Sequence, residues 1–215
     1  MSKPILIALG AAAALVITLP LTAQTAPKIP GSKDATAITG GTYTADASHT
    51  MVVWTVDHLG FTPYSGIFGD IAGTLTLDPK NPVAAKVDVT IPVSKATTAS
   101  AGLTKHLFKP AGANGKADFF GATPADARFV STKVVPKGKD SATITGDLTL
   151  NGVTKPVTLE ATFYGAGKAP AMMGGKENVG FSAKGKIIRS QFGIGYAVPV
   201  VSDEVTLKIY AGFQK

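Results

Sequence analysis

Alternating apolar and polar residues run through most of the chain, and the alternation is clearest between Ala142 and Phe163. Apolar side chains lie two residues apart on both sides of Asn151-Gly152, a dipeptide that tolerates positive φ at both central turn positions. This pattern predicts a β-hairpin closed by a two-residue type I′ turn. Counting back from the turn pairs Leu150 with Val153, Gly146 with Val157 and Ile144 with Leu159. A slip of one residue would expose the whole apolar face, so we expect this register to be strongly specified.

The same period of two recurs from Thr42 to Lys215, and it gives each predicted strand one apolar and one polar face. Three glycines interrupt the stretch from Tyr64 to Asp78, and we interpret them as bends of one long strand that curls around a barrel. The pattern breaks from Ala99 to Pro124. There we expect a short helix near Leu103 and Leu107, followed by a loop over one end of the barrel.

About eight antiparallel strands with one apolar face each can close into a barrel, which leaves no strand edge unpaired. We therefore expect an all-β fold. An outer-membrane barrel would turn its apolar face to lipid, but an aromatic content of 7% leaves no aromatic girdles and favours a soluble barrel. A soluble barrel of this size either fills with its own side chains or keeps room for one small ligand.

The N-terminal residues have the layout of a secretory signal peptide, with one Lys, an apolar run from Ile5 to Leu19, and then Pro20 and small residues. An apolar run of about fifteen residues is shorter than the roughly 20 that span a bilayer, although an uncleaved anchor helix is the alternative. We expect cleavage after Ala23 or Ala26. The domains are then a signal peptide at 1–23, a flexible Pro- and Gly-containing lead-in at 24–41 and one barrel domain at 42–215. The expected location is the periplasm or the outside of the cell.

Composition and motifs narrow the possible functions. The chain has no Cys, which excludes disulfides and thiol catalysis. Lys and Arg exceed Asp and Glu by 21 to 14, but they are scattered, so we expect no nucleic-acid partner. The sequence contains no nucleophile elbow, no phosphate loop and no His-Glu-x-x-His motif, so we expect no enzymatic activity and no cofactor. A metal site built from His49, His58 and His106 is a less favoured alternative.

Inward-facing residues are the candidate ligand-binding residues. Small residues at Gly146, Ala161, Ala183, Gly185 and Ala211 share faces with large aromatic ones, which favours a tunnel over a plugged barrel that binds proteins. The predicted apolar lining consists of Val52, Trp54, Val56, Phe68, Leu75, Val89, Ile91, Phe119, Phe120, Phe129, Ile144, Leu148, Val157, Leu159, Phe163, Phe181, Ile187 and Leu207.

Two polar residues, His58 and Arg189, lie in phase with an apolar face and are candidates for contacts to a polar head group. Each has a structural alternative. His58 fits a hydrogen-bonded core histidine, and Arg189 fits an ion pair with Asp203 or Glu204.

Several longer motifs follow one another along the chain. They are Thr42–His49 with Val52-x-Trp54-x-Val56-x-His58-Leu59-Gly60-Phe61, then Gly66-Ile67-Phe68, Gly73–Asp78, Asp118-Phe119-Phe120, Gly146–Val157, Gly180-Phe181 and Arg189–Ile194. In this order they resemble the YceI-like, polyisoprenoid-binding family over essentially all of 42–215. The chain departs from the family at Leu103-Thr104-Lys105-His106-Leu107, which lacks the Arg-Asp pair, and in a Gly- and Ala-rich insertion before Asp118.

The resemblance implies a secreted or periplasmic, lipocalin-like barrel. Such a barrel would enclose a long isoprenoid of quinone or polyprenyl type, or a similar amphiphilic lipid, for transport or storage. The implied partners are this lipid and, transiently, a membrane. A homodimer formed through an exposed strand face is left open.

Overall fold

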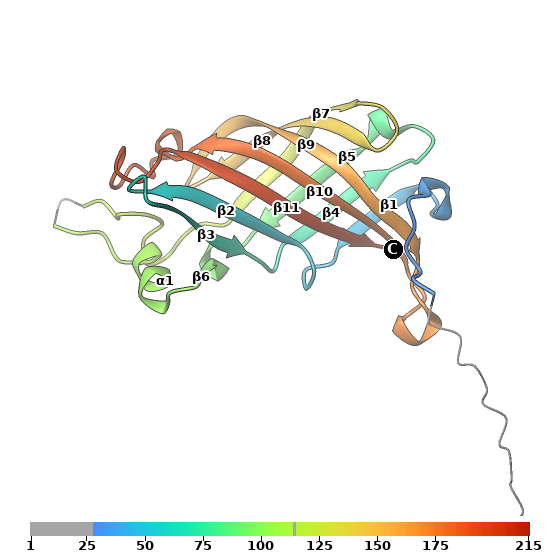
Figure 1. The fold of residues 1–215 in the computed structure, drawn as a ribbon, viewed down its shortest axis with the longest axis horizontal. Helices are drawn as coiled ribbons and strands as arrows, with labels where there is room; N and C mark the ends of the chain where they lie inside the picture. Colours follow the sequence, from blue (N-terminus) through green and yellow to red (C-terminus); the bar gives the residue numbers. More distant parts are fainter. Residues whose placement is uncertain (1–27, 114) are drawn as a thin grey trace, which may run out of the picture.

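The computed structural model describes residues 28–113 and 115–215, which form one antiparallel sheet of eleven strands that closes on itself (Figure 1). The strands are β1 (Gly41–Ala45), β2 (Met51–His58), β3 (Thr62–Phe68), β4 (Ala72–Leu77), β5 (Lys86–Ile91), β6 (Thr97–Thr98), β7 (Ala127–Pro136), β8 (Ser141–Leu150), β9 (Val153–Lys168), β10 (Glu177–Ile188) and β11 (Glu204–Gln214). The helices are α1 (Ala101–Leu107) and five 3-10 turns: η1 (Ala35–Ala37), η2 (Pro82–Ala84), η3 (Val93–Lys95), η4 (Ala171–Met173) and η5 (Arg189–Phe192). In the described part of the chain, no helix has the length and apolar character to cross a bilayer. The predicted signal peptide lies outside the described residues.

Barrel closure depends on β11, which has different partners along its length. Its C-terminal residues Phe213 and Gln214 pair with β1, which also pairs with β4 and so completes a ring of eight strands. Its earlier residues Thr206 to Tyr210 pair with β2, from which β3 and β6 extend. The predicted all-β antiparallel barrel with one short helix is confirmed.

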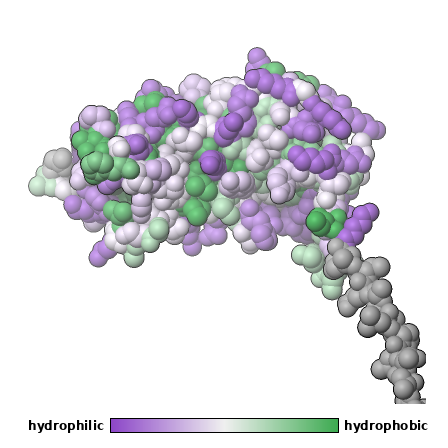
Figure 2. Space-filling model, in the orientation of Figure 1, coloured by the Kyte–Doolittle hydropathy of each residue, from purple (hydrophilic) through white to green (hydrophobic). Residues whose placement is uncertain are grey.

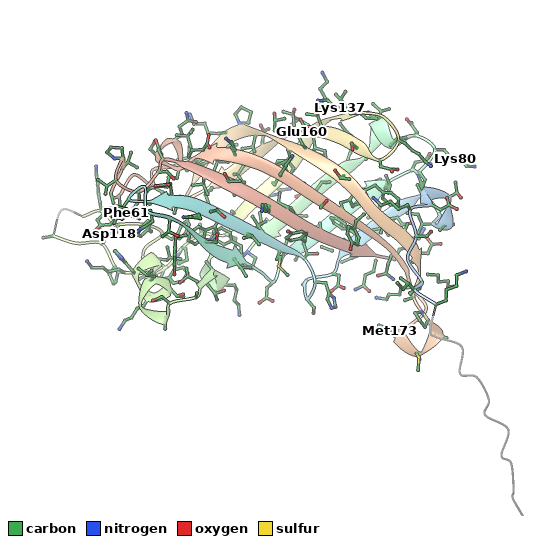
Figure 3. The ribbon with its side chains drawn as sticks, in the orientation of Figure 1. Phe61, Lys80, Asp118, Lys137, Glu160 and Met173 are labelled. Atoms are coloured by element: carbon green, nitrogen blue, oxygen red, sulfur yellow. The ribbon has the colours of Figure 1, made fainter. Side chains whose placement is uncertain are left out.

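The two ends of the barrel differ. We call the end that carries α1, the β2–β3 turn and the β10–β11 loop the helix end, and the end that carries η1 and the β4–β5 and β7–β8 turns the turn end (Figure 1). Figure 3 shows Phe61 and Asp118 at the helix end and Lys80 at the turn end.

The predicted hairpin is formed by β8 and β9 in the expected register. Leu150 pairs with Val153, Gly146 with Val157 and Ile144 with Leu159. Asn151 and Gly152 have φ values of 51° and 76°, as a type I′ turn requires. The Asn151 side chain also donates a hydrogen bond of 3.0 Å to the Phe192 carbonyl, which links the turn to η5.

The prediction of one long strand from Tyr64 to Asp78 is wrong, because the chain forms two strands there, β3 and β4. The break falls at Gly69-Asp70, where Asp70 has a φ of 54°. β3 pairs with β2, whereas β4 pairs with β1 and β5. Gly73, with a φ of 135°, lets β5 approach closely, since a Cβ there would overlap the Asp88 carbonyl oxygen.

The described part of the predicted flexible lead-in is bound to the barrel. Ser32 and Ala166 exchange two backbone hydrogen bonds, of 2.9 and 2.8 Å. Ile38 is buried in the core, and the Thr39 N–H donates to the Glu177 carboxylate at 2.9 Å. The sequence does not reveal these contacts, because a few hydrogen bonds and one buried apolar residue leave no periodic pattern.

Tyr43 anchors this segment to the barrel and makes the stability of the fold depend on pH. Its side chain is fully buried, and its single O–H lies within hydrogen-bond distance of two acceptors, the Thr39 carbonyl oxygen and Glu177 Oε2. Burial, reinforced by the Glu177 carboxylate, raises the pKa of Tyr43 from 10.0 to about 12. The stability that this shift contributes is complete below the unfolded-state pKa of 10.0 and is lost as the pH rises towards 12.

We therefore expect the free energy of unfolding to fall between pH 10 and 12 by up to about 3 kcal/mol through Tyr43 alone. In a Tyr43→Phe variant this component should be missing. Urea unfolding from pH 8 upward measures it, with Tyr210→Phe as the control because Tyr210 is exposed. Equal alkaline slopes in wild type and Tyr43→Phe would contradict the assignment.

Candidate ligand-binding cavity

An apolar cavity of about 320 Å³ lies inside the barrel. Its wall consists of the side chains that alternate inward along the strands. The predicted residues found in this wall are Val52, Phe68, Leu75, Val89, Ile91, Phe129, Ile144, Leu148, Val157, Leu159, Phe163, Phe181, Ile187 and Leu207. The apolar faces therefore point into the barrel, and the outward-facing alternative of a lipid-exposed apolar surface is wrong.

Four predicted lining residues are not in the wall: Trp54, Val56, Phe119 and Phe120. Trp54 follows Val52 on the inner face of β2, but its indole lies over Gly66, where a Cβ would overlap the ring. Phe119 and Phe120 pack against the core, and the Phe120 ring meets the Phe68 ring edge-on at 6.1 Å. These residues belong to the packing of the helix end.

The helix end of the barrel is filled by side chains. Phe192 and Ile194 are buried there, and neither lines the cavity. The loop after α1 is held down by a hydrogen bond of 3.0 Å from the Phe120 N–H to the Leu107 carbonyl. The helix and loop thus cover one end of the barrel, as the sequence predicted (Figure 1).

A polar and aromatic cluster joins this loop to the segment after η5. The His106 and Asp118 side chains are 2.8 Å apart. This hydrogen bond from His106 holds the pKa of Asp118 below its usual value. The rings of His106, Phe119 and Tyr196 contact one another edge-on at centroid distances of 5.2 to 5.5 Å.

The cavity reaches the surface at the turn end. Its wall continues there into residues of η1 and of the β4–β5 and β7–β8 turns, namely Ala35, Pro79, Pro82, Gly138, Lys139 and Asp140. Lys139 and Asp140 are the only charged residues among those described that line the cavity. The sequence predicts a cover at one end of the barrel but does not indicate this opening, since the turn residues around it show no alternation.

The small residues that the sequence places on the inner faces divide into two groups. Ala161, Ala183 and Ala211 line the cavity and leave it open, as predicted. Gly146 and Gly185 instead make room for neighbouring protein side chains. A Cβ at Gly146 would overlap the Phe129 ring and approach the Val130 carbonyl oxygen within 2.6 Å.

A Gly146→Ala substitution should therefore destabilise the barrel by about 1–3 kcal/mol, because the Phe129 ring and the β7 backbone must shift. Gly69→Ala is the matched control, since nothing lies within 4 Å of a Cβ there. Urea unfolding of both variants compares them. Equal stability of the two would show that the Phe129 ring moves aside at no cost.

Neither of the predicted polar contacts lies at the cavity. His58 is exposed at the end of β2 and forms a backbone bridge with Val201, so it is not a core histidine either. Arg189 is buried, but the ion pair predicted for it is not formed. Asp203 instead accepts hydrogen bonds from the Ser190 N–H and hydroxyl, at 2.8 and 2.6 Å.

Arg189 donates to four backbone carbonyl oxygens, all of them in the β10–β11 loop. They are those of Ser202 and Ile194, both at 2.9 Å, and those of Tyr196 and Val201, both at 2.8 Å. Burial lowers the pKa of the guanidinium from its usual value. Arg189 is thus a structural residue that fixes the course of the loop.

The three histidines of the metal-site alternative do not come together. His49 pairs with Asp46 at 2.7 Å, His106 pairs with Asp118, and His58 is exposed. Within 28–113 and 115–215, no group of three or more His, Cys, Asp or Glu side chains could hold a metal ion.

Comparisons with known proteins agree with this fold. Residues 43–213 match the YceI-like domain. Protein YceI of Shigella flexneri is 45% identical over 165 residues, which are 76% of this chain and 81% of that protein. The structure of the Campylobacter jejuni YceI protein is 30% identical and has a TM-score of 0.61, covering 74% of this chain and 89% of its own.

A polyisoprenoid binding domain from Saccharophagus degradans has a TM-score of 0.56 and covers 80% of this chain and 97% of its own, and its 12% identity shows likeness of fold alone. The domain match extends through nearly all of the barrel, from β1 to β11. From these matches, and in agreement with its sequence motifs, the chain belongs to the YceI-like domain family.

Proposed function

We propose that the protein holds a long-chain isoprenoid of quinone or polyprenyl type, or a similar amphiphilic lipid, inside its barrel for transport or storage. The observation that carries the proposal is the apolar cavity of about 320 Å³ that opens at the turn end. Each methylene group that it buries contributes about 0.8 kcal/mol before ordering and association costs. The tail alone can therefore provide most of the affinity.

The comparisons support this proposal at the level of the family. The Saccharophagus degradans domain, which shares the fold, is described as polyisoprenoid binding. A plugged barrel that only binds proteins would leave no such cavity. The protein acts by binding and shielding its lipid, without converting it chemically.

The proposed location is the periplasm or the outside of the cell, where the lipid would be exchanged in transient contact with a membrane. This rests on the apolar run from Ile5 to Leu19 and the Pro20 that follows it. N-terminal sequencing of the protein from its native source tests it. A mature chain that starts after Ala23 or Ala26 supports export, and a chain that retains these residues contradicts cleavage.

Mass spectrometry of the organic extract from natively purified protein tests the lipid itself. We expect a stoichiometric long-tailed lipid, which the spectrum would identify. Repeated extraction of nothing, together with no uptake of added isoprenoid lipid, would overturn the proposal in favour of a barrel that serves as a protein-binding module.

A further inference from the structure

Two hydrogen-bond donors on β2 and β3, the strands that extend from the closed ring, have no acceptor in the described part of the chain. Trp54 Nε1 and Tyr64 Oη are both buried, and neither has a hydrogen-bond partner among the residues that the structure describes. A buried donor without a partner loses its hydration and gains nothing in return, so native proteins keep few of them. Two such atoms on one pair of strands therefore indicate a group that these residues bind.

The strand register places the two side chains together on the inner face. Trp54 of β2 lies opposite Gly66 of β3, and Tyr64 lies opposite Val56, so Trp54 and Tyr64 are diagonal neighbours. Gly66 allows the indole to lie across β3, because any Cβ there would overlap the ring. The sequence of β3 thus makes room for this orientation of Trp54.

The donors adjoin the inner part of the cavity, on the side of the helix end. Val52 precedes Trp54 by two residues on the same face, and Leu207 of β11 lies directly opposite Trp54. Both residues line the cavity, as does Phe68, which lies opposite Val52. Trp54 is thus flanked on its own strand and on both neighbouring strands by positions at or next to the cavity wall, at the inner end of the cavity.

The charges in the cavity wall restrict the chemistry of the ligand. Among the described lining residues the one cation is Lys139, and it lies at the turn end. An uncharged N–H and an uncharged O–H suit a neutral acceptor oxygen. A phosphate placed beside them would have no cation to balance its charge, and burying such a charge is costly.

We propose that Trp54 Nε1 and Tyr64 Oη bind the carbonyl oxygen of a neutral, quinone-type head group, with the isoprenoid tail running through the cavity towards the turn end. This inference rests on the proposed lipid-binding function and deepens it. In this arrangement the head group lies at the inner end of the cavity, and the tail extends to its open end.

The single tryptophan of the chain allows a direct test, because Trp54 fluorescence reports on the proposed site alone. The probes are a benzoquinone with a short isoprenoid tail, the same tail ending in a methyl group, and the same tail ending in a phosphate. The quinone should quench Trp54 on binding. In Tyr64→Phe, calorimetry should show quinone binding weakened about three- to tenfold, the worth of one hydrogen bond, with binding of the methyl-ended tail unchanged.

Two controls separate a binding role from a structural one. Tyr64→Phe without ligand should melt no lower than wild type, since the lost hydroxyl has no partner in the fold. Tyr164→Phe, at a side chain that is 75% exposed, should bind all three probes as wild type does.

Three outcomes would overturn the inference. Equal weakening of the quinone and the methyl-ended tail in Tyr64→Phe, or no weakening of either, would remove the donors from the binding site while leaving the lipid-binding function standing. Tightest binding of the phosphate probe, lost in Lys139→Gln, would place the head group at the turn end. Failure of wild type to bind any of the three would refute the proposed function as well.

Discussion

Phenylalanine in place of Ala183 should empty the barrel of lipid while leaving the fold nearly intact. Ala183 of β10 lies between Ala161 of β9 and Ile209 of β11, and all three line the cavity. A phenyl ring there extends into the space of about 320 Å³ that the tail would occupy. Overpacking a core costs about 1–3 kcal/mol, and here the ring enters open space, so the cost should lie near the lower limit.

Lipid content per protein, measured by mass spectrometry after native purification, is the readout, with circular dichroism and thermal melting to verify the fold. Ala161→Phe should act in the same way, because it enters the cavity at the same level. Thr162→Phe is the matched control, since Thr162 is exposed next to Ala161 on the outer face of β9. Unchanged lipid in both alanine variants would mean that no tail occupies this level of the barrel.

Alternation identified most of the cavity wall, because a β-strand fixes which face each side chain points to. Residues such as Leu148, Leu159 and Phe181 could be assigned to the interior from the sequence alone, and the structure places them in the wall. Alternation does not give the position along the barrel axis. Trp54 and Val56 share the inner face of β2 with Val52, yet they lie beyond the cavity, towards the helix end.

The roles of the glycines could not be read from their size. Gly146 and Gly185 share faces with large residues, which suggests space for a ligand, but the neighbouring strands fill that space. Leu159 reaches over Gly185, where a Cβ would lie 2.6 Å from its Cδ2 atom. The difference from Ala183, which faces the cavity, depends on the rotamers of residues in neighbouring strands, and these follow from tertiary packing.

The closed and open ends of the barrel are set by segments without periodicity. Phe192 and Ile194 fill the helix end from a short 3-10 turn and the residues after it, where no pattern of two or of 3.6 marks them as core. At the turn end, Ala35 and Pro82 border the opening from loops. The sequence could locate the cavity in the barrel, but the direction of ligand access required the loop geometry.

Replacing Arg189 by Met should be among the most damaging single substitutions in the barrel, with an expected loss of about 3 kcal/mol or more in the free energy of unfolding, since each buried carbonyl left without a donor costs about 1–3 kcal/mol. Arg189 is 5% exposed, and its guanidinium donates to four carbonyl oxygens of the β10–β11 loop. Methionine fills a similar volume but donates no hydrogen bond. Either these carbonyls stay buried without a partner, or the loop moves away from the barrel. A domain of ordinary stability, about 5–15 kcal/mol, would lose a large part of its margin.

Two further variants separate the geometry of the guanidinium from its charge. Arg189→Lys keeps the charge, but one ammonium group cannot reach four carbonyls, so we expect it to recover only a minor part of the loss. Arg128→Met is the matched control, because Arg128 is 58% exposed and solvent screens its ion pair with Asp88 at 2.6 Å, so its loss should change the stability little. Urea unfolding of the three variants ranks them. If Arg189→Met lost no more stability than Arg128→Met, water would be replacing the guanidinium at the carbonyls, and the β10–β11 loop would owe its course to the packing of Phe192 and Ile194.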